Sequence, residues 1–120
     1  MEVVNPRDVL AAIFLNFPVD DFENDREKIH SAFSKIRERH FDLLKEIVFR
    51  KNLLFPRSRV LDEVLSCLQP EFLGKINPTY EQYTIKKIEL KKLWEKELKS
   101  SLGDKEPEIK EIANELKKLL

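Results

Sequence analysis

Residues 58–85 read SRVLDEVLSCLQPEFLGKINPTYEQYTI and contain a helix pattern followed by a hairpin pattern. In the first half, apolar side chains recur at helical spacing behind Ser58, and serine is a residue type whose hydroxyl caps the first turn of a helix. We expect the Ser58 hydroxyl to accept a hydrogen bond from the backbone N–H of Leu61. In the second half, an Asn-Pro turn signal separates two short stretches, and the second of them alternates in polarity. The sequence therefore predicts a capped helix over 58–69 and the only β-hairpin over 72–85.

The segment before this stretch predicts further helices. Asn5 followed by Pro6 is an N-cap with proline at the first helical position, so a helix is expected over 6–16. After an acidic loop, Asn24 or Asp25 caps an amphipathic helical pattern that continues to about residue 50. A break near His40 leaves open whether this pattern forms one helix or two.

Three shorter features are expected from local composition. Leu53, Leu54 and Phe55 predict a short buried extended segment that the following proline ends. Cys67 lies among apolar residues, where a small buried hydrophobic side chain is expected. Gly103 is expected to end a Lys/Glu-rich helix over 85–102 as its C′ residue.

The composition limits the class of protein. The chain has 120 residues, of which 37% are charged, and its 22 Lys and Arg balance its 22 Asp and Glu. This length fits one domain, and the few glycines favour helices over an all-β fold. A single cysteine cannot form an intramolecular disulfide, and no stretch approaches the roughly 20 apolar residues of a membrane span. We therefore expect a cytoplasmic protein.

The order of the predicted elements resembles the winged-helix domain, a helix-turn-helix variant whose β-hairpin is the wing. The resemblance covers 25–85, with the helix over 58–69 in the place of the recognition helix. It implies a mainly α fold with one β-hairpin plus a C-terminal helical extension. On this interpretation residues 1–102 form the winged-helix-like domain, and 103–120 form an amphipathic helix for packing or dimerisation. A first strand, if there is one, is expected at 53–55.

The charge balance excludes indiscriminate binding of nucleic acid, because the chain has no net charge. Residues 25–57 nevertheless contain nine basic and five acidic side chains, whereas 58–85 contain two and four. Two carboxylates, Asp62 and Glu63, stand on the outer face of the helix that would read DNA and would repel phosphates. The candidate nucleic-acid-binding residues are Arg57, Arg59, Ser66, Gln69, Lys75 and Asn77.

The last two helices supply a second candidate surface. Apolar residues repeat at heptad-like spacing behind Pro107, which fits either a helical hairpin within the chain or docking on a second subunit. On the preceding helix, Glu89 with Lys92 and Glu95 with Lys99 have the spacing of a self-paired solvated face. The candidate partner or dimer interface residues are Trp94, Leu98, Ile109, Ile112, Leu116 and Leu119.

No pattern predicts catalysis. The two histidines, His30 and His40, lie apart, and with one cysteine they do not provide four zinc ligands. The glycines stand alone, so no phosphate-binding loop is expected. We therefore expect no cofactor, no metal and no enzymatic activity. The functional hypothesis is a non-enzymatic binding module, either a small dimeric DNA-binding regulator or a protein-interaction adaptor that does not bind DNA.

Overall fold

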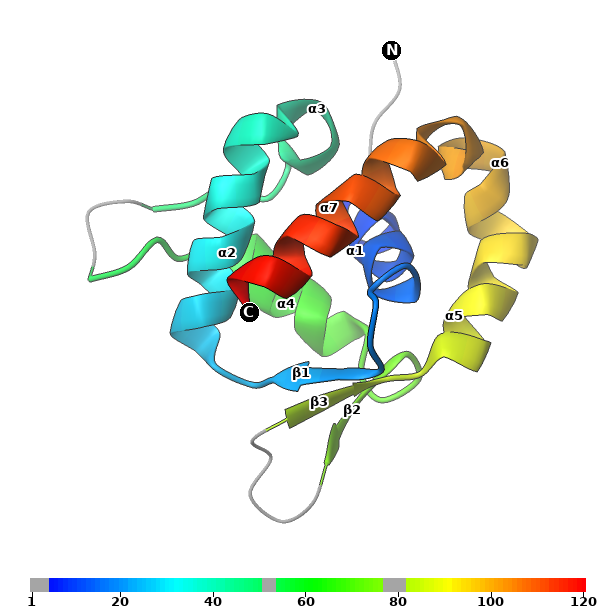
Figure 1. Ribbon diagram of the computed structural model, residues 1–120, viewed down its shortest axis with the longest axis horizontal. Helices are drawn as coiled ribbons and strands as arrows, with labels where there is room; N and C mark the ends of the chain where they lie inside the picture. Colours follow the sequence, from blue (N-terminus) through cyan, green and yellow to red (C-terminus); the bar gives the residue numbers. More distant parts are fainter. Residues whose placement is uncertain (1–4, 51–53, 77–81) are drawn as a thin grey trace.

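A computed structural model describes residues 5–50, 54–76 and 82–120 (Figure 1). Within them, helices surround one central helix, and a small sheet closes one end of the molecule. The helices are α1 (Pro6–Leu15), α2 (Arg26–Arg39), α3 (Phe41–Leu44), α4 (Arg59–Cys67), α5 (Lys87–Leu93), α6 (Lys99–Leu102) and α7 (Glu106–Leu119). A π-helical segment, Trp94–Leu98, joins α5 to α6, and a 3-10 turn, Gly103–Lys105, joins α6 to α7. The strands are β1 (Asp21–Glu23), β2 (Leu73–Ile76) and β3 (Gln82–Ile85).

The central helix is α1. Every side chain from Val9 to Phe14 is fully buried, as expected for a helix that is apolar on all sides. Helix α1 packs against α3, α4, α5 and α7, and in Figure 1 it lies behind α7. Asn5 caps it as predicted, because its side chain accepts a hydrogen bond of 2.9 Å from the backbone N–H of Arg7. The core of the protein is therefore assembled around its first helix.

The sheet is antiparallel and has three strands in the order β1-β3-β2. The hairpin of β2 and β3 confirms the prediction over 72–85, whereas β1 corrects the prediction of an acidic loop. Phe22 of β1 stacks on Tyr83 of β3 and on Phe14 of α1, with ring centroids 5.1 and 5.2 Å apart. Asp21 and Glu23 point outward on either side of it. A single buried aromatic side chain therefore attaches an otherwise acidic segment to the sheet.

Helices α2 and α3 show that the pattern over 25–50 forms two helices, with His40 between them. The second is much shorter than predicted, since α3 ends at Leu44. The guanidinium of Arg37 donates hydrogen bonds to the carbonyl oxygens of Leu44 and Lys45, at 3.2 and 3.1 Å. These bonds satisfy carbonyls that further helical turns would have used.

Three local predictions are corrected. Leu54 is fully exposed rather than buried, and Leu53 lies outside the described residues. The first strand of the described sheet is β1, and Leu54 and Phe55 belong to no strand of it. Cys67 is exposed because it falls on the outer face of α4. Gly103 has a φ of −59°, so it continues the chain as a right-handed turn and is not a left-handed C′ residue. The 3-10 turn that it begins leads directly into α7.

Within the described residues, no helix is long and apolar enough to cross a membrane.

Candidate nucleic-acid interface at the start of helix α4

The start of α4 is fixed by two hydrogen bonds at one residue. The Ser58 hydroxyl accepts from the backbone N–H of Leu61 at 3.1 Å, which confirms the predicted cap. The backbone N–H of Ser58 itself donates to Nδ1 of His30 on α2, at 3.0 Å. Both Ser58 and His30 are buried. The first turn of α4 is therefore held both by its own cap and by a side chain from another helix.

His30 also contacts Asp62 in the first turn of α4. Because Nδ1 accepts from Ser58, the neutral ring carries its proton on Nε2, which donates to Asp62 Oδ1 at 2.8 Å. Burial lowers the pKa of His30 by more than the hydrogen bond to Asp62 raises it. The ring is therefore a neutral link between two helices.

Arg26, the first residue of α2, completes this network. Its Nε donates to Asp62 Oδ1 at 3.2 Å, and Nη2 of the same guanidinium donates to Oδ2. Burial alone would raise the pKa of Asp62, but the hydrogen bonds from Arg26 and His30 outweigh that effect and lower it. Asp62 is thus an ionised carboxylate whose charge is matched within the chain.

Four arginines gather around this end of α4. Arg50 and Arg57 exchange backbone hydrogen bonds of 2.7 and 3.2 Å, so the chain returns beside itself just before α4. Arg59 follows in the first turn, where its Nε donates to Glu63 at 3.0 Å. We call Arg26, Arg50, Arg57 and Arg59 the arginine cluster, and all four are exposed. Two carboxylates of α4, Asp62 and Glu63, each have an arginine of this cluster as their partner.

The structure brings only part of the predicted nucleic-acid set to this site. Arg57 and Arg59 lie together, and Ser66 is exposed on the same helix. Gln69 is half-buried, and its amide donates to the carbonyl oxygen of Leu65 at 3.0 Å, so it is turned back onto its own helix. The backbone of Lys75 lies in β2. Asn77 lies outside the described residues.

Arg26 and Arg50 were not among the predicted residues. Arg26 is distant from α4 in sequence, and only the fold places its guanidinium on Asp62. For Arg50 the sequence contains a weak indication of a role in binding, because this residue belongs to the basic segment before α4. No helical or strand periodicity links either residue to α4, so local sequence patterns do not identify them as members of this site.

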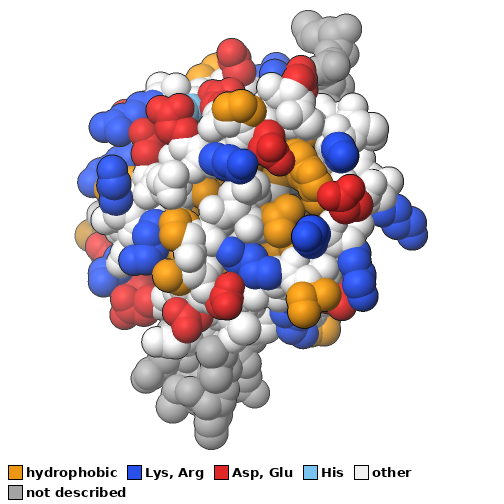
Figure 2. Space-filling view, turned by 45° about the vertical axis from the view of Figure 1, so that its right-hand side comes forward, with side chains coloured by type: hydrophobic (Ala, Val, Ile, Leu, Met, Phe, Trp, Pro, Cys, Tyr) orange, Lys and Arg blue, Asp and Glu red, His pale blue; other side chains and the backbone are white. Residues whose placement is uncertain are grey.

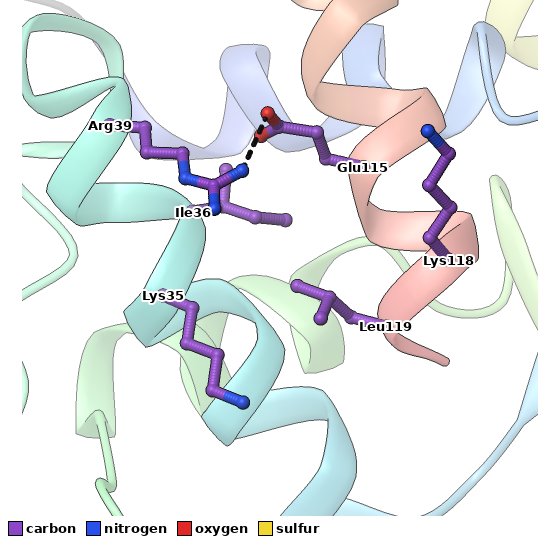
Figure 3. A pocket seen from close by; sticks show the side chains of 6 residues that line it. All are labelled: Lys35, Ile36, Arg39, Glu115, Lys118 and Leu119. Atoms are coloured by element: carbon purple, nitrogen blue, oxygen red, sulfur yellow. Dashed lines mark hydrogen bonds and ion pairs between the residues drawn. The ribbon is translucent and has the colours of Figure 1, made fainter.

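The predicted partner interface lies mostly inside the chain. The main contacts of helix α7 are with α1 and α2 of its own chain, rather than with α5 as a hairpin of the last two helices would require. Leu119 alone among the six residues is exposed, and it borders a surface pocket of about 200 Å³ beside Lys35, Arg39 and Glu115 (Figure 3). The buried members of the predicted set are Trp94, Leu98, Ile109, Ile112 and Leu116.

The outer face of α5 and the π-helical segment pairs its own charges. Lys92 lies 3.6 Å from Glu89, and Lys99 lies 3.9 Å from Glu95, as the spacing predicted. Figure 2 shows positive and negative side chains interspersed on the face that it presents. This face is thus less suited to bind phosphates than the arginine cluster.

One group of side chains in the described residues can hold a metal ion, namely His40, Glu111 and Glu115. The sequence expectation was of no metal site, because His40 stands alone along the chain. The fold brings two carboxylates of α7 beside this imidazole, which the sequence does not indicate.

Neither the models of known protein families, nor the curated proteins, nor the solved structures include a significant match to this chain.

Proposed function

We propose that the protein is a non-enzymatic, winged-helix-like module that binds duplex DNA through the arginine cluster and the exposed face of α4. The observation that carries this proposal is that Asp62 and Glu63 are each paired with an arginine. In the sequence these carboxylates argued against contact with phosphates. Each is matched by an arginine, and the cluster still has positive side chains beyond those two pairs.

The order of the elements supports the winged-helix part of the proposal. Strand β1 follows the first helix and joins the outer edge of β3, so the sheet has the order β1-β3-β2. Winged-helix domains usually place their first strand one helix earlier than the segment directly before the recognition helix, and β1 here precedes α2 and the short α3. Helix α4 then precedes the hairpin, as the recognition helix precedes the wing.

The rigidity of the first turn of α4 also favours a binding role. A helix that presents side chains to a groove needs a fixed position relative to the domain. The bonds from His30 to Ser58 and Asp62 supply that position from α2. The dipole at a helix start also favours a phosphate there.

The test is fluorescence anisotropy of a short labelled duplex of random sequence, titrated with protein over a series of salt concentrations. We expect micromolar binding at low salt. The double variant Arg57→Glu, Arg59→Glu should lose this binding. The milder Arg57→Gln, Arg59→Gln should reduce the slope of log K against log salt by about 2, since two phosphate contacts are lost.

A matched control is Lys91→Glu, Lys96→Glu, which makes the same change of charge at exposed positions of α5 and the π-helical segment. If both charge reversals weaken binding equally, the contact is with the overall charge and not with the arginine cluster. If the unmodified protein leaves the duplex unbound at micromolar concentration and low salt, the DNA proposal is wrong.

The second candidate function is a protein-interaction adaptor that does not bind DNA. It is favoured by exposed apolar side chains on the segment between α2 and α4, namely Phe41, Val48 and Leu54. Large apolar groups of this kind are typical anchors of protein interfaces. An absence of DNA binding, with the fold intact, would favour this function.

A further inference from the structure

Helix α7 carries a row of glutamates on the side that faces the end of α2. Glu108, Glu111 and Glu115 follow one another at spacings of three and four residues, so they share one face of the helix. His40, between α2 and α3, is directed at this row, and its side chain is only 8% exposed. The donor atoms of His40, Glu111 and Glu115 all lie within 4.8 Å of one another.

The two nitrogens of His40 have different environments. Nδ1 lies 2.9 Å from Glu108 Oε2 and forms a hydrogen bond with it. A carboxylate only accepts hydrogen bonds, so Nδ1 carries a proton, and in the neutral ring Nε2 is then a bare acceptor. Nε2 is buried and has no hydrogen-bond partner in the described part of the chain.

A second buried acceptor faces this nitrogen. Oε2 of Glu115 also has no hydrogen-bond partner among the described residues, and it lies 3.3 Å from Nε2. Its sister oxygen, Oε1, is 3.2 Å from the guanidinium of Arg39, which holds the carboxylate in place (Figure 3). Two unsatisfied acceptors in contact repel each other unless a metal cation or a proton lies between them.

The distance between the two acceptors suits a metal ion. Nitrogen and oxygen ligands of a tetrahedral zinc ion lie about 2.1 Å from the metal, which places two such ligands about 3.4 Å apart. The distance of 3.3 Å between Nε2 of His40 and Oε2 of Glu115 fits this ligand-to-ligand separation. Hydrogen bonding of the other ring nitrogen to a carboxylate, as Glu108 provides, is the usual way in which a metal-binding histidine is oriented.

We propose that His40, Glu111 and Glu115 bind a divalent transition-metal ion of the zinc type, with Glu108 as the positioning residue for His40. One imidazole and two carboxylates give three protein ligands, and water fills the remaining position. The ion ties α7 to the junction of α2 and α3. This site is separate from the arginine cluster, which adjoins the other end of α2.

The test is isothermal titration of the tag-free protein with Zn²⁺, together with thermal unfolding in its presence. We expect one ion per chain and a rise in the unfolding midpoint, because an ion that binds only the folded state stabilises it. Co²⁺ added to the metal-free protein should give the visible absorption bands of a low-symmetry site, and Zn²⁺, which binds more tightly, should displace it and abolish the bands. An excess of Mg²⁺ or Ca²⁺ should not compete, since a nitrogen ligand disfavours these ions.

Variants distinguish Zn²⁺ binding at this site from unspecific Zn²⁺ binding to an acidic helix. Glu108→Ala should weaken Zn²⁺ binding roughly 10- to 100-fold. Glu111→Gln, at an exposed position where the fold is not at risk, should weaken it at least as much. The matched control is Glu106→Gln on the same helix, whose carboxylate pairs with Lys110 instead, and it should leave the affinity within about twofold.

Two results would overturn the proposal. One is the absence of saturable Zn²⁺ binding in the unmodified protein. The other is equal affinity in the unmodified protein, Glu111→Gln and Glu106→Gln. Either result would show that the cluster of His40 and the glutamates is structural and holds no metal ion. The outcome is independent of the DNA-binding test, because no residue is common to the two sites.

Discussion

Nδ1 of His30 accepts a hydrogen bond of 3.0 Å from the backbone N–H of Ser58 and so connects α2 to the N-cap of α4. Through Nε2 the same ring holds Asp62, one turn further along α4. A single fully buried imidazole therefore sets where the proposed recognition helix begins and how it is oriented. The first three predictions follow from this connection.

Replacement of His30 by alanine should destabilise the fold. The change opens a cavity and leaves the Ser58 N–H and the Asp62 carboxylate without their partner, which we expect to cost about 2–4 kcal/mol of unfolding free energy. Urea unfolding followed by circular dichroism measures the loss. Ser31→Ala, on the same helix and only partly buried, should change stability by less than about 0.5 kcal/mol. Equal effects of the two substitutions would contradict the role given to His30.

Stability should depend on pH through His30. Burial places the pKa of this group below its ordinary value of 6.5 in the folded state. Between the two values the unfolded chain binds a proton that the folded chain does not, so stability is lost as pH falls below about 6.5. Above that pH the contribution is fully present. Urea unfolding across this range should show the loss in the unmodified protein and a smaller one in His30→Gln. An identical pH profile of stability in both proteins would show that His30 is not the source of the pH dependence.

The Ser58 cap can be tested separately from the His30 contact. Ser58→Ala removes the hydroxyl that accepts from Leu61 but keeps the backbone N–H that donates to His30. The expected loss is about 1 kcal/mol, and Ser58→Gly should cost only a few tenths of a kcal/mol because glycine is tolerated at this position. Chemical unfolding compares the two variants. A larger loss for glycine than for alanine would show that the cap is not the main contribution.

The packing of α7 predicts how the last helix behaves. Ile112 is fully buried between α7 and the rest of the chain, so Ile112→Ala should cost about 2–5 kcal/mol. Leu119→Ala, at a position 39% exposed, should cost less than about 1 kcal/mol. The unfolding midpoint should not depend on protein concentration, because these contacts lie within one chain. A midpoint that rises with concentration would show that α7 is stabilised by a second copy.

The exposure of Cys67 predicts that a thiol reagent reaches it in the folded protein. Titration with a chromogenic disulfide under native conditions should modify one thiol per chain without loss of the helical circular dichroism signal. The sequence context suggested a buried side chain, for which modification would require unfolding. Modification seen only in denaturant would therefore show that Cys67 is buried in the folded protein.

Local signals predicted the elements whose causes are local. The Asn5 cap, the Ser58 cap and the pairing of two neighbouring strands each depend on residues within a few positions of one another, and the structure has α1, α4 and the paired strands β2 and β3 at these places. The charge pairs of α5 and of the segment that joins it to α6 follow from helical spacing in the same way.

The features that were missed depend on contacts between distant segments. Strand β1 forms because Phe22 stacks on Tyr83, and nothing in its acidic neighbourhood signals this contact. Cys67 and Leu54 are exposed because of how their segments are turned relative to the core, which short apolar patterns do not specify.

The sequence by itself determined a mainly helical protein with one hairpin, since caps, turns and periodicity act within a few residues. Only the tertiary structure decided the chemistry of the surface, because electrostatic interactions depend on distance in space. It matched Asp62 and Glu63 with arginines, and so removed the repulsion that the sequence assigned to α4. It also placed His40, alone in the sequence, against the glutamates of α7, more than sixty residues away along the chain.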